Sequence, residues 1–86
     1  MAKRFVYFYF MKNEPDKIRE IVPSHIDYWK SNNLDNYMGG PFADGTGGLI
    51  SFEAASLDQA TEIIEKDPFI INEVIEKKWI KEWIPE

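Results

Sequence analysis

The 86-residue chain has no cysteine and one histidine, His25. Without cysteine it forms no disulfide bonds, offers no thiolate ligands and has no cysteine nucleophile. A single histidine cannot complete a structural zinc site, so we expect no metal and no cofactor, although a weak, carboxylate-rich cation site stays open. The absence of cysteine also suits a reducing compartment, and we expect a cytoplasmic protein.

Long hydrophobic runs are absent as well. The basic N-terminus followed by the apolar residues 5–11 has the outline of a signal peptide. The run is too short for a membrane-spanning helix, contains Tyr7 and Tyr9, and lacks a small-residue cleavage site before Lys12. We therefore expect this segment to form a buried strand and the protein to have no membrane partner.

Basic residues are few. Ten lysines and arginines face fifteen acids, for a net charge of −5, and residues 56–86 alone hold eight acids and four bases. Neutralised phosphates supply most of the affinity for nucleic acids, and basic clusters attract anionic membranes, so an acidic chain without a basic stripe binds both poorly. We expect no nucleic-acid partner.

The remaining composition, with 44% apolar residues, predicts one small domain over residues 1–86. The segment from Arg4 to Met11 is aromatic and β-branched, which is typical of a central strand buried on both faces. Further along we expect a helix over 16–33 that kinks or restarts at Pro23, strands over 34–40 and 48–53, a helix from Ser56 to Asp67, a short turn through Asn72, and an edge strand over 74–84.

This β-α-β-β-α-β order is that of the ferredoxin-like split βαβ fold, in the α+β class. Both helices then cover one face of a four-stranded antiparallel sheet. The first strand carries aromatic side chains on both faces, so the other face of the sheet would expose a large apolar patch. We expect a second copy of the chain to cover it in a homodimer, sheet face to sheet face.

All five glycines lie between positions 39 and 48. Neither a phosphate-loop ending nor a dinucleotide-binding fingerprint accompanies them. Glycine lets the backbone approach a ligand closely or adopt positive φ. We expect Gly39, Gly40 and Pro41 to contact a small molecule, with backbone amides near Gly39 and Gly40 stabilising an oxyanion.

His25, Tyr28 and Trp29 follow helical i, i+3, i+4 spacing and share one side of the predicted helix. Two interpretations of His25 stay open: a general acid or base near neutral pH, or a half-buried histidine at the border of the core. Asp44 either orients His25 or stabilises its own Asp-Gly hairpin turn. Four aromatic residues either line an apolar pocket or belong to the core or the dimer interface, namely Trp29, Tyr37, Trp79 and Trp83. We expect Tyr28 and Trp29 to contact the substrate.

Three motifs, in order along nearly the whole chain, resemble the YciI-like family (YCII-related domain) of the dimeric α+β barrel superfamily. Pro23-x-His25-x-x-Tyr28 is similar to the family's Pro-x-His helix start, Gly40-Pro41 with Asp44 and Gly45 to its Gly-Pro, Asp, Gly loop, and Asp67-Pro68-Phe69 to its Asp-Pro-Phe turn. The resemblance implies a His-Asp pair at His25 and Asp44. Relatives often carry arginine where this chain has Val22, which leaves the charge of the substrate open.

A few members of this family resemble dehydrochlorinases or lactone isomerases of aromatic breakdown, which implies a lyase- or isomerase-like activity. We therefore expect a small cofactor-independent enzyme in which His25 moves a proton on a small cyclic or carbonyl-bearing substrate and Asp44 holds the imidazole. Two alternatives stay open. One is a non-catalytic small-molecule binding or accessory module that uses the same pocket, and the other is a purely structural dimerisation domain.

Overall fold

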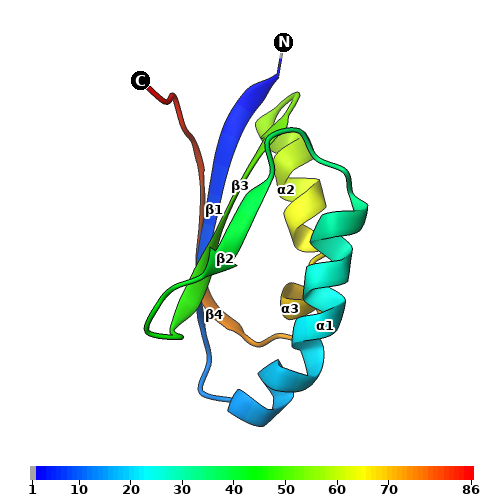
Figure 1. Cartoon of the computed structure of the whole chain (residues 1–86), viewed down its shortest axis with the longest axis vertical. Coiled ribbons are helices and arrows are strands. Elements are labelled where there is room, and N and C mark those ends of the chain that lie inside the picture. The colour runs from blue at the N-terminus through cyan, green and yellow to red at the C-terminus, as the bar shows by residue number, and fades with distance from the viewer. Residues whose placement is uncertain (1) are drawn as a thin grey trace.

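The computed structural model describes residues 2–86 as two layers, a four-stranded antiparallel sheet and a layer of helices (Figure 1). The order β2-β3-β1-β4 of the strands confirms the expected ferredoxin-like arrangement, to which the structure adds one short helix, α3. The strands are β1 (Lys3–Met11), β2 (Met38–Pro41), β3 (Gly47–Ala54) and β4 (Ile75–Glu82), and the helices are α1 (Pro15–Ser31), α2 (Leu57–Glu65) and α3 (Pro68–Ile71).

Strand β1 is central, as its sequence predicts. It pairs antiparallel with β3 on one side and with β4 on the other, and β4 forms one edge of the sheet. Side chains alternate along a strand, so Phe5, Tyr7 and Tyr9 all point toward the helices, where each is at most 5% exposed. They form the sheet's contribution to the core.

Helices α2 and α3 start directly after residues whose side chains cap them. The hydroxyl of Ser56 accepts a hydrogen bond from the backbone of Gln59 at 3.1 Å, and the side chain of Gln59 reaches back to the backbone N–H of Ala55 at 2.6 Å. Helix α3 begins with Pro68 directly after Asp67, whose carboxylate caps it. These caps fix where α2 and α3 begin, beneath the sheet.

Helix α1 runs through Pro23 as one continuous element. It changes direction after its first turns (Figure 1), which agrees with the kink that the sequence predicts, because proline removes one backbone hydrogen bond from a helix. Its later turns carry His25 and Trp29, and Trp29 is only 1% exposed in the core. The straight second part of α1 therefore positions both side chains under the sheet.

The second strand is shorter than expected and begins later. The sequence predicts a strand over 34–40, but β2 is Met38–Pro41. The cause is local, because Asn33 and Asn36 have φ values of 49° and 52°, and this left-handed conformation interrupts an extended backbone. The loop that results places Tyr37 at the entrance to β2.

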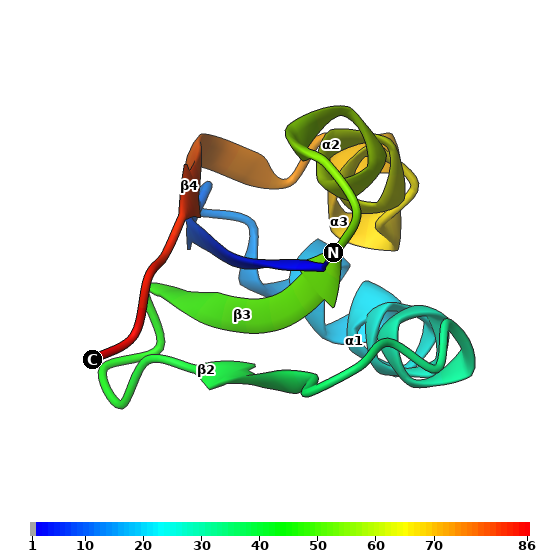
Figure 2. The same ribbon diagram turned by 90° about the horizontal axis from the view of Figure 1, so that it is seen from above.

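The helices cover one face of the sheet and leave the opposite face open (Figure 2). We call the open side the outer face. Its aromatic side chains pack on one another, with the rings of Phe8 and Trp79 stacked at 5.3 Å between centroids. Leu49, Trp79 and Trp83 remain 38%, 40% and 49% exposed. None of the helices within residues 2–86 is long and apolar enough to cross a membrane.

Candidate functional site

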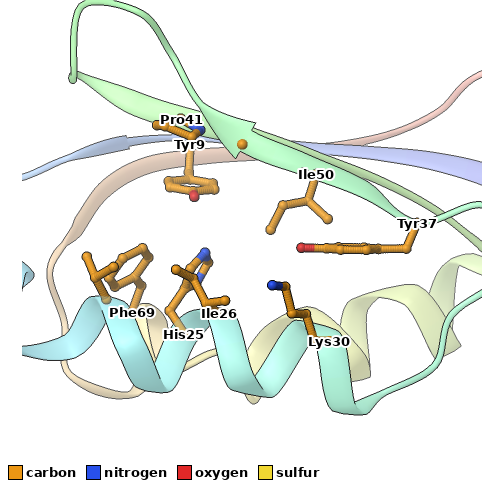
Figure 3. Close-up of a pocket in the computed structure, with 11 residues that line it drawn as sticks. Tyr9, His25, Ile26, Lys30, Tyr37, Pro41, Ile50 and Phe69 are labelled. Atoms are coloured by element: carbon orange, nitrogen blue, oxygen red, sulfur yellow. The ribbon is translucent and has the colours of Figure 1, made fainter.

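A cavity of about 390 Å³ lies between helix α1 and strand β2 at the edge of the sheet (Figure 3). Four parts of the chain that are distant in sequence meet around it, namely α1, the β2 segment, the sheet strands and α3. Most of its wall is apolar, and its polar side chains are few. Those on which the chemistry depends are His25, Lys30, Tyr9 and Tyr37, with Ile26 and Phe69 between them.

The imidazole of His25 contacts a carboxylate, but the carboxylate belongs to Asp67. Nδ1 of His25 lies 2.8 Å from Oδ1 of Asp67. The side chain of Asp67 is fully buried, and that of His25 is 12% exposed. The ring projects from α1 toward the cavity (Figure 3), so His25 lies between a buried acid and a space that a small molecule can enter.

Three donors satisfy the buried carboxylate of Asp67. Besides His25, the backbone N–H of Phe69 donates to Oδ1 at 2.8 Å, and Nε1–H of Trp29 donates to Oδ2 at 3.0 Å. A carboxylate accepts in each of these bonds, so Nδ1 of His25 carries the proton in the pair. In the neutral imidazole this leaves the lone pair on Nε2 free.

Aromatic rings hold the imidazole in place. Phe69 stacks on His25 with centroids 4.0 Å apart and an interplanar angle of 17°, and Tyr9 meets it edge-on at 6.2 Å and 70°. Stacking on one face and the bond to Asp67 together restrict rotation about the side-chain torsions. The imidazole is therefore pre-oriented before any ligand arrives, as a catalytic base requires.

Two glycines make room for tyrosine hydroxyls at the cavity. A Cβ at Gly48 would lie 2.6 Å from the hydroxyl of Tyr9, and a Cβ at Gly39 would lie 3.0 Å from the hydroxyl of Tyr37. A larger residue at either position would push these phenol groups aside. Gly39 and Gly48 therefore contribute to the site because the missing side chains leave space for the two tyrosine hydroxyl groups.

Burial raises the pKa of Tyr9 and of Tyr37, and the negative charge of Asp67 raises the pKa of both further. Both phenols consequently keep their protons at neutral pH. A protonated phenol can donate a hydrogen bond to an oxygen of a ligand.

The predicted contact between His25 and Asp44 is not made within the chain. Asp44 is exposed in the hairpin between β2 and β3, where its Oδ1 accepts bonds from the backbone N–H and the hydroxyl of Thr46, at 3.0 Å and 2.6 Å. These bonds hold the pKa of Asp44 below its usual value. Both bonds end on Oδ1 and are those that the turn-forming interpretation of Asp44 expects, whereas a catalytic role of Asp44 stays a prediction.

The other predicted binding residues divide into two groups. Gly39, Gly40 and Pro41 line the cavity, and their contact with a ligand stays a prediction. Tyr28 and Trp29 do not line it: Trp29 is in the core, and the hydroxyl of Tyr28 donates to the backbone carbonyl of Ile63 on α2. Tyr28 thus connects α1 to α2, and Trp29 connects α1 to Asp67, the residue that caps α3.

Asp67, Lys30 and Tyr9 are polar residues of the site that the sequence analysis did not identify as such. An aspartate directly before proline is a common helix cap, so its pattern predicts a structural role and conceals its contact with His25. Lys30 belongs to the series Val22, Ile26 and Lys30, spaced by four residues along the helix beside His25. That spacing is the signal that could have placed Lys30 at the cavity.

Within residues 2–86, side chains that bind metals do not gather in groups of three or more. His25 lines the cavity and pairs with the buried carboxylate of Asp67 behind it.

Two comparisons concern the sequence. The sequence pattern of the YCII-related domain matches residues 3–84. The uncharacterized protein YjpA of Bacillus subtilis (strain 168) is 48% identical over 46 residues, which are 54% of this chain and 53% of YjpA. The match to YjpA thus spans about half the length of that relative.

Two solved structures have a similar fold. One is the 5-chloro-2-hydroxyhydroquinone dehydrochlorinase TftG of Burkholderia phenoliruptrix AC1100, in complex with 2,5-dihydroxybenzoquinone, with a TM-score of 0.81 and 21% identity over 94% of this chain and 93% of TftG. The other is Rv0793 of Mycobacterium tuberculosis, with a TM-score of 0.58 and 14% identity over 100% of this chain and 96% of Rv0793. At these identities the likeness concerns the fold, whereas the pattern matched over residues 3–84 shows that the chain belongs to the family of YCII-related domains.

Proposed function

We propose that the cavity binds a small cyclic or carbonyl-bearing molecule and that His25 transfers a proton within it, without a cofactor. One observation carries the proposal. The imidazole binds a fully buried carboxylate through Nδ1 at 2.8 Å, while the ring faces a cavity of about 390 Å³. Cavities of about 150 Å³ accept a benzene molecule, so this one has room for a single substituted ring.

In this proposal Asp67 has the role that the sequence analysis gave to Asp44. It accepts the Nδ1 proton of His25, which fixes the tautomer that presents the Nε2 lone pair. When Nε2 takes a proton, the nearby negative charge of Asp67 stabilises the imidazolium. The pair can therefore act as a base and, in the reverse step, as an acid.

The simplest reaction begins at a carbon next to a carbonyl group. The carbon–hydrogen bond breaks, its proton moves to Nε2, and its electron pair shifts toward the carbonyl oxygen, where a protonated tyrosine such as Tyr37 can donate a hydrogen bond. The electrons then either expel a leaving group, which is elimination, or take the proton back at another carbon, which is isomerisation. Neither route changes the oxidation state of the protein.

TftG supplies a first candidate substrate, because it is described as a dehydrochlorinase of 5-chloro-2-hydroxyhydroquinone. A chlorinated hydroxyhydroquinone is a single substituted ring, which matches the size of the cavity in this chain. In the keto tautomer of such a ring, His25 can take the proton of a ring hydroxyl group while the electron pair of that bond shifts through the ring and expels chloride. The product is a hydroxybenzoquinone, and the step is an elimination of the kind that a pre-oriented histidine can assist.

The test measures turnover with and without the imidazole. Two assays would be run on the wild type and on the variant. One follows chloride release from 5-chloro-2-hydroxyhydroquinone, and the other follows deuterium uptake from heavy water by cyclic ketones and unsaturated lactones. His25→Asn keeps an amide nitrogen near the position of Nδ1, and thus the bond to Asp67, but has no group that takes a proton. We expect it to lower the rate about 10²–10⁴-fold.

Asp44→Asn is the matched variant for the pair that the sequence predicted. It should retain the wild-type rate because, among residues 2–86, the side chain of Asp44 bonds to Thr46 alone. An unchanged rate in His25→Asn would exclude acid–base catalysis by His25. Binding that depends on His25 without turnover of any substrate would favour the non-catalytic binding module. The observation in favour of a non-catalytic role is that the carboxylate of Asp67 also accepts bonds from Trp29 and Phe69, so that its contact with His25 is part of the packing of the fold.

The proposal also includes a homodimer in which the outer faces of two copies cover each other. The protein is proposed to be cytoplasmic. The exposed Leu49, Trp79 and Trp83 and the absence of helices on that face support it (Figure 2). Trp79→Glu should convert dimers to monomers in sedimentation velocity experiments. Ile71→Glu is the matched control, because Ile71 is 65% exposed but lies on α3, on the helical side. A wild type that is monomeric at micromolar concentration would exclude the dimer.

A further inference from the structure

Lys30 is the one lysine or arginine among the residues that line the cavity. It lies in the last turn of α1, five residues after His25. Figure 3 shows its amino group pointing away from the helix into the cavity, toward the end at which the hydroxyl of Tyr37 also points. The apolar side chain of Ile50 lies above this end.

The charge of Lys30 has no partner within the part of the chain that the structure describes. None of the ion pairs formed by residues 2–86 includes Lys30. The described lining of the cavity also contains no aspartate or glutamate, since the carboxylate of Asp67 is behind the ring of His25 and has no exposed surface. Lys30 is exposed, so the cavity of an acidic protein has at its rim a positive charge that no carboxylate of residues 2–86 pairs with.

Tyr37 complements this charge with a hydrogen-bond donor. Burial keeps its pKa above the ordinary value, so the phenol stays protonated and can donate. Gly39 leaves the space in which the hydroxyl lies, because a Cβ there would be 3.0 Å from the phenol oxygen. A cationic amine and a protonated phenol that point toward the same end of the cavity can both donate a hydrogen bond to one oxygen, and an anionic oxygen is the acceptor that suits them best.

We infer that Lys30 and Tyr37 form an anion-binding end of the cavity, and that the molecule bound there is a single ring with a carboxylate or phenolate oxygen. The inference rests on the proposed function, because it specifies the charge of the substrate for the same cavity. The oxygen binds to Lys30 and Tyr37, while the ring lies along Ile26 and Ile50 toward His25. This arrangement would orient the reacting carbon toward the imidazole.

The test compares the binding of charged and neutral rings of the same shape. The probes are benzoate and 2-hydroxybenzoate, with benzamide and 2-hydroxybenzamide as neutral counterparts. Their dissociation constants would be measured from the shifts of the His25 imidazole signals in NMR titrations. The wild type should bind each carboxylate more tightly than its amide.

Lys30→Met removes the charge but keeps an unbranched side chain, and it should weaken the binding of benzoate about three- to tenfold, to the level of benzamide. This range corresponds to an ion pair in a partly solvated site. Lys30→Arg should restore most of the difference. Lys17→Met is the matched control on the same helix, because Lys17 is exposed and does not line the cavity. It should bind all four probes like the wild type.

Three results would overturn the inference: benzoate binding unchanged in Lys30→Met, amides that bind the wild type as well as carboxylates do, or no binding of either kind. Lys30→Gln repeats the measurement with a polar side chain, so that a folding defect of one variant does not decide the outcome. The readout is binding, so it is separate from the turnover assay of His25. Charge-dependent binding without turnover would support the role of Lys30 and contradict the proposed proton transfer.

Discussion

The substitution Asp67→Asn tests the arrangement on which both the fold and the site depend. Asparagine has the shape of aspartate but replaces one acceptor oxygen with an NH₂ donor. The two oxygens of Asp67 receive three hydrogen bonds, two at Oδ1 from His25 and Phe69 and one at Oδ2 from Trp29. Whichever way the amide is oriented, its NH₂ group faces at least one N–H donor.

The cost follows from burial, because Asp67 and Trp29 are 0% and 1% exposed and water cannot replace the lost acceptor. If the amide oxygen stays at the position of Oδ1, the NH₂ group and Nε1–H of Trp29 are both left without acceptors. Each buried unsatisfied donor costs about 1–3 kcal/mol, so we expect a loss of roughly 3 kcal/mol. In the opposite orientation the helix cap and the bond to His25 are lost, at a similar cost.

A loss of this size is large for a domain of 86 residues, whose free energy of unfolding is about 4–13 kcal/mol. The melting temperature should fall by roughly 12–24 °C, since each kcal/mol shifts it by about 4–8 °C in a small domain. Urea denaturation and thermal melting, followed by circular dichroism, would measure both quantities. Asp27→Asn is the control, because this substitution removes the same charge from an exposed position on α1.

A double-mutant cycle with Trp29→Phe isolates the contact between the two side chains. Phenylalanine has no N–H that needs an acceptor. Trp29→Phe should therefore lower the free energy of unfolding less in the Asp67→Asn background than in the wild type, with a coupling energy of about 1–2 kcal/mol. If Asp67→Asn remains within about 0.5 kcal/mol of Asp27→Asn, the buried carboxylate is not the hydrogen-bond centre described above.

Two further predictions concern the glycine-rich segment and the buried tyrosines. Gly47→Ala should cost at least about 3 kcal/mol or prevent folding, because its Cβ would lie 1.8 Å from the carbonyl oxygen of Tyr9, whereas Gly40→Ala meets nothing within 4 Å and should change stability by less than about 1 kcal/mol. Equal urea midpoints for the two variants would contradict this. Burial, with the charge of Asp67, raises the pKa of Tyr7 and of Tyr9. Their contribution to stability is therefore complete below the unfolded-state value of about 10 and is lost as pH rises toward the folded-state values. Tyrosinate absorbance should consequently rise together with alkaline unfolding, and ionisation of these residues in the folded state would refute the prediction.

Local patterns in the sequence were sufficient for most of the fold. The alternation of β1, the capping residues Ser56 and Asp67, and the order of strands and helices each depend on neighbouring residues, whose sterics and hydrogen bonds are independent of the distant chain. The boundaries of β2 were predicted less well, because the left-handed conformations of Asn33 and Asn36 are accessible to asparagine without being required by it.

The partner of His25 was decided by tertiary structure alone. Asp44 is closer in sequence, but the donors of Thr46, two residues away, occupy its carboxylate in the hairpin. Asp67, 42 residues from His25, reaches the imidazole only because α1 and α3 pack side by side beneath the sheet. Packing of the same kind turns Lys30 toward the cavity. Sequence patterns describe which groups a residue can bind nearby, whereas a pairing across the fold depends on how whole elements pack to bury their apolar faces.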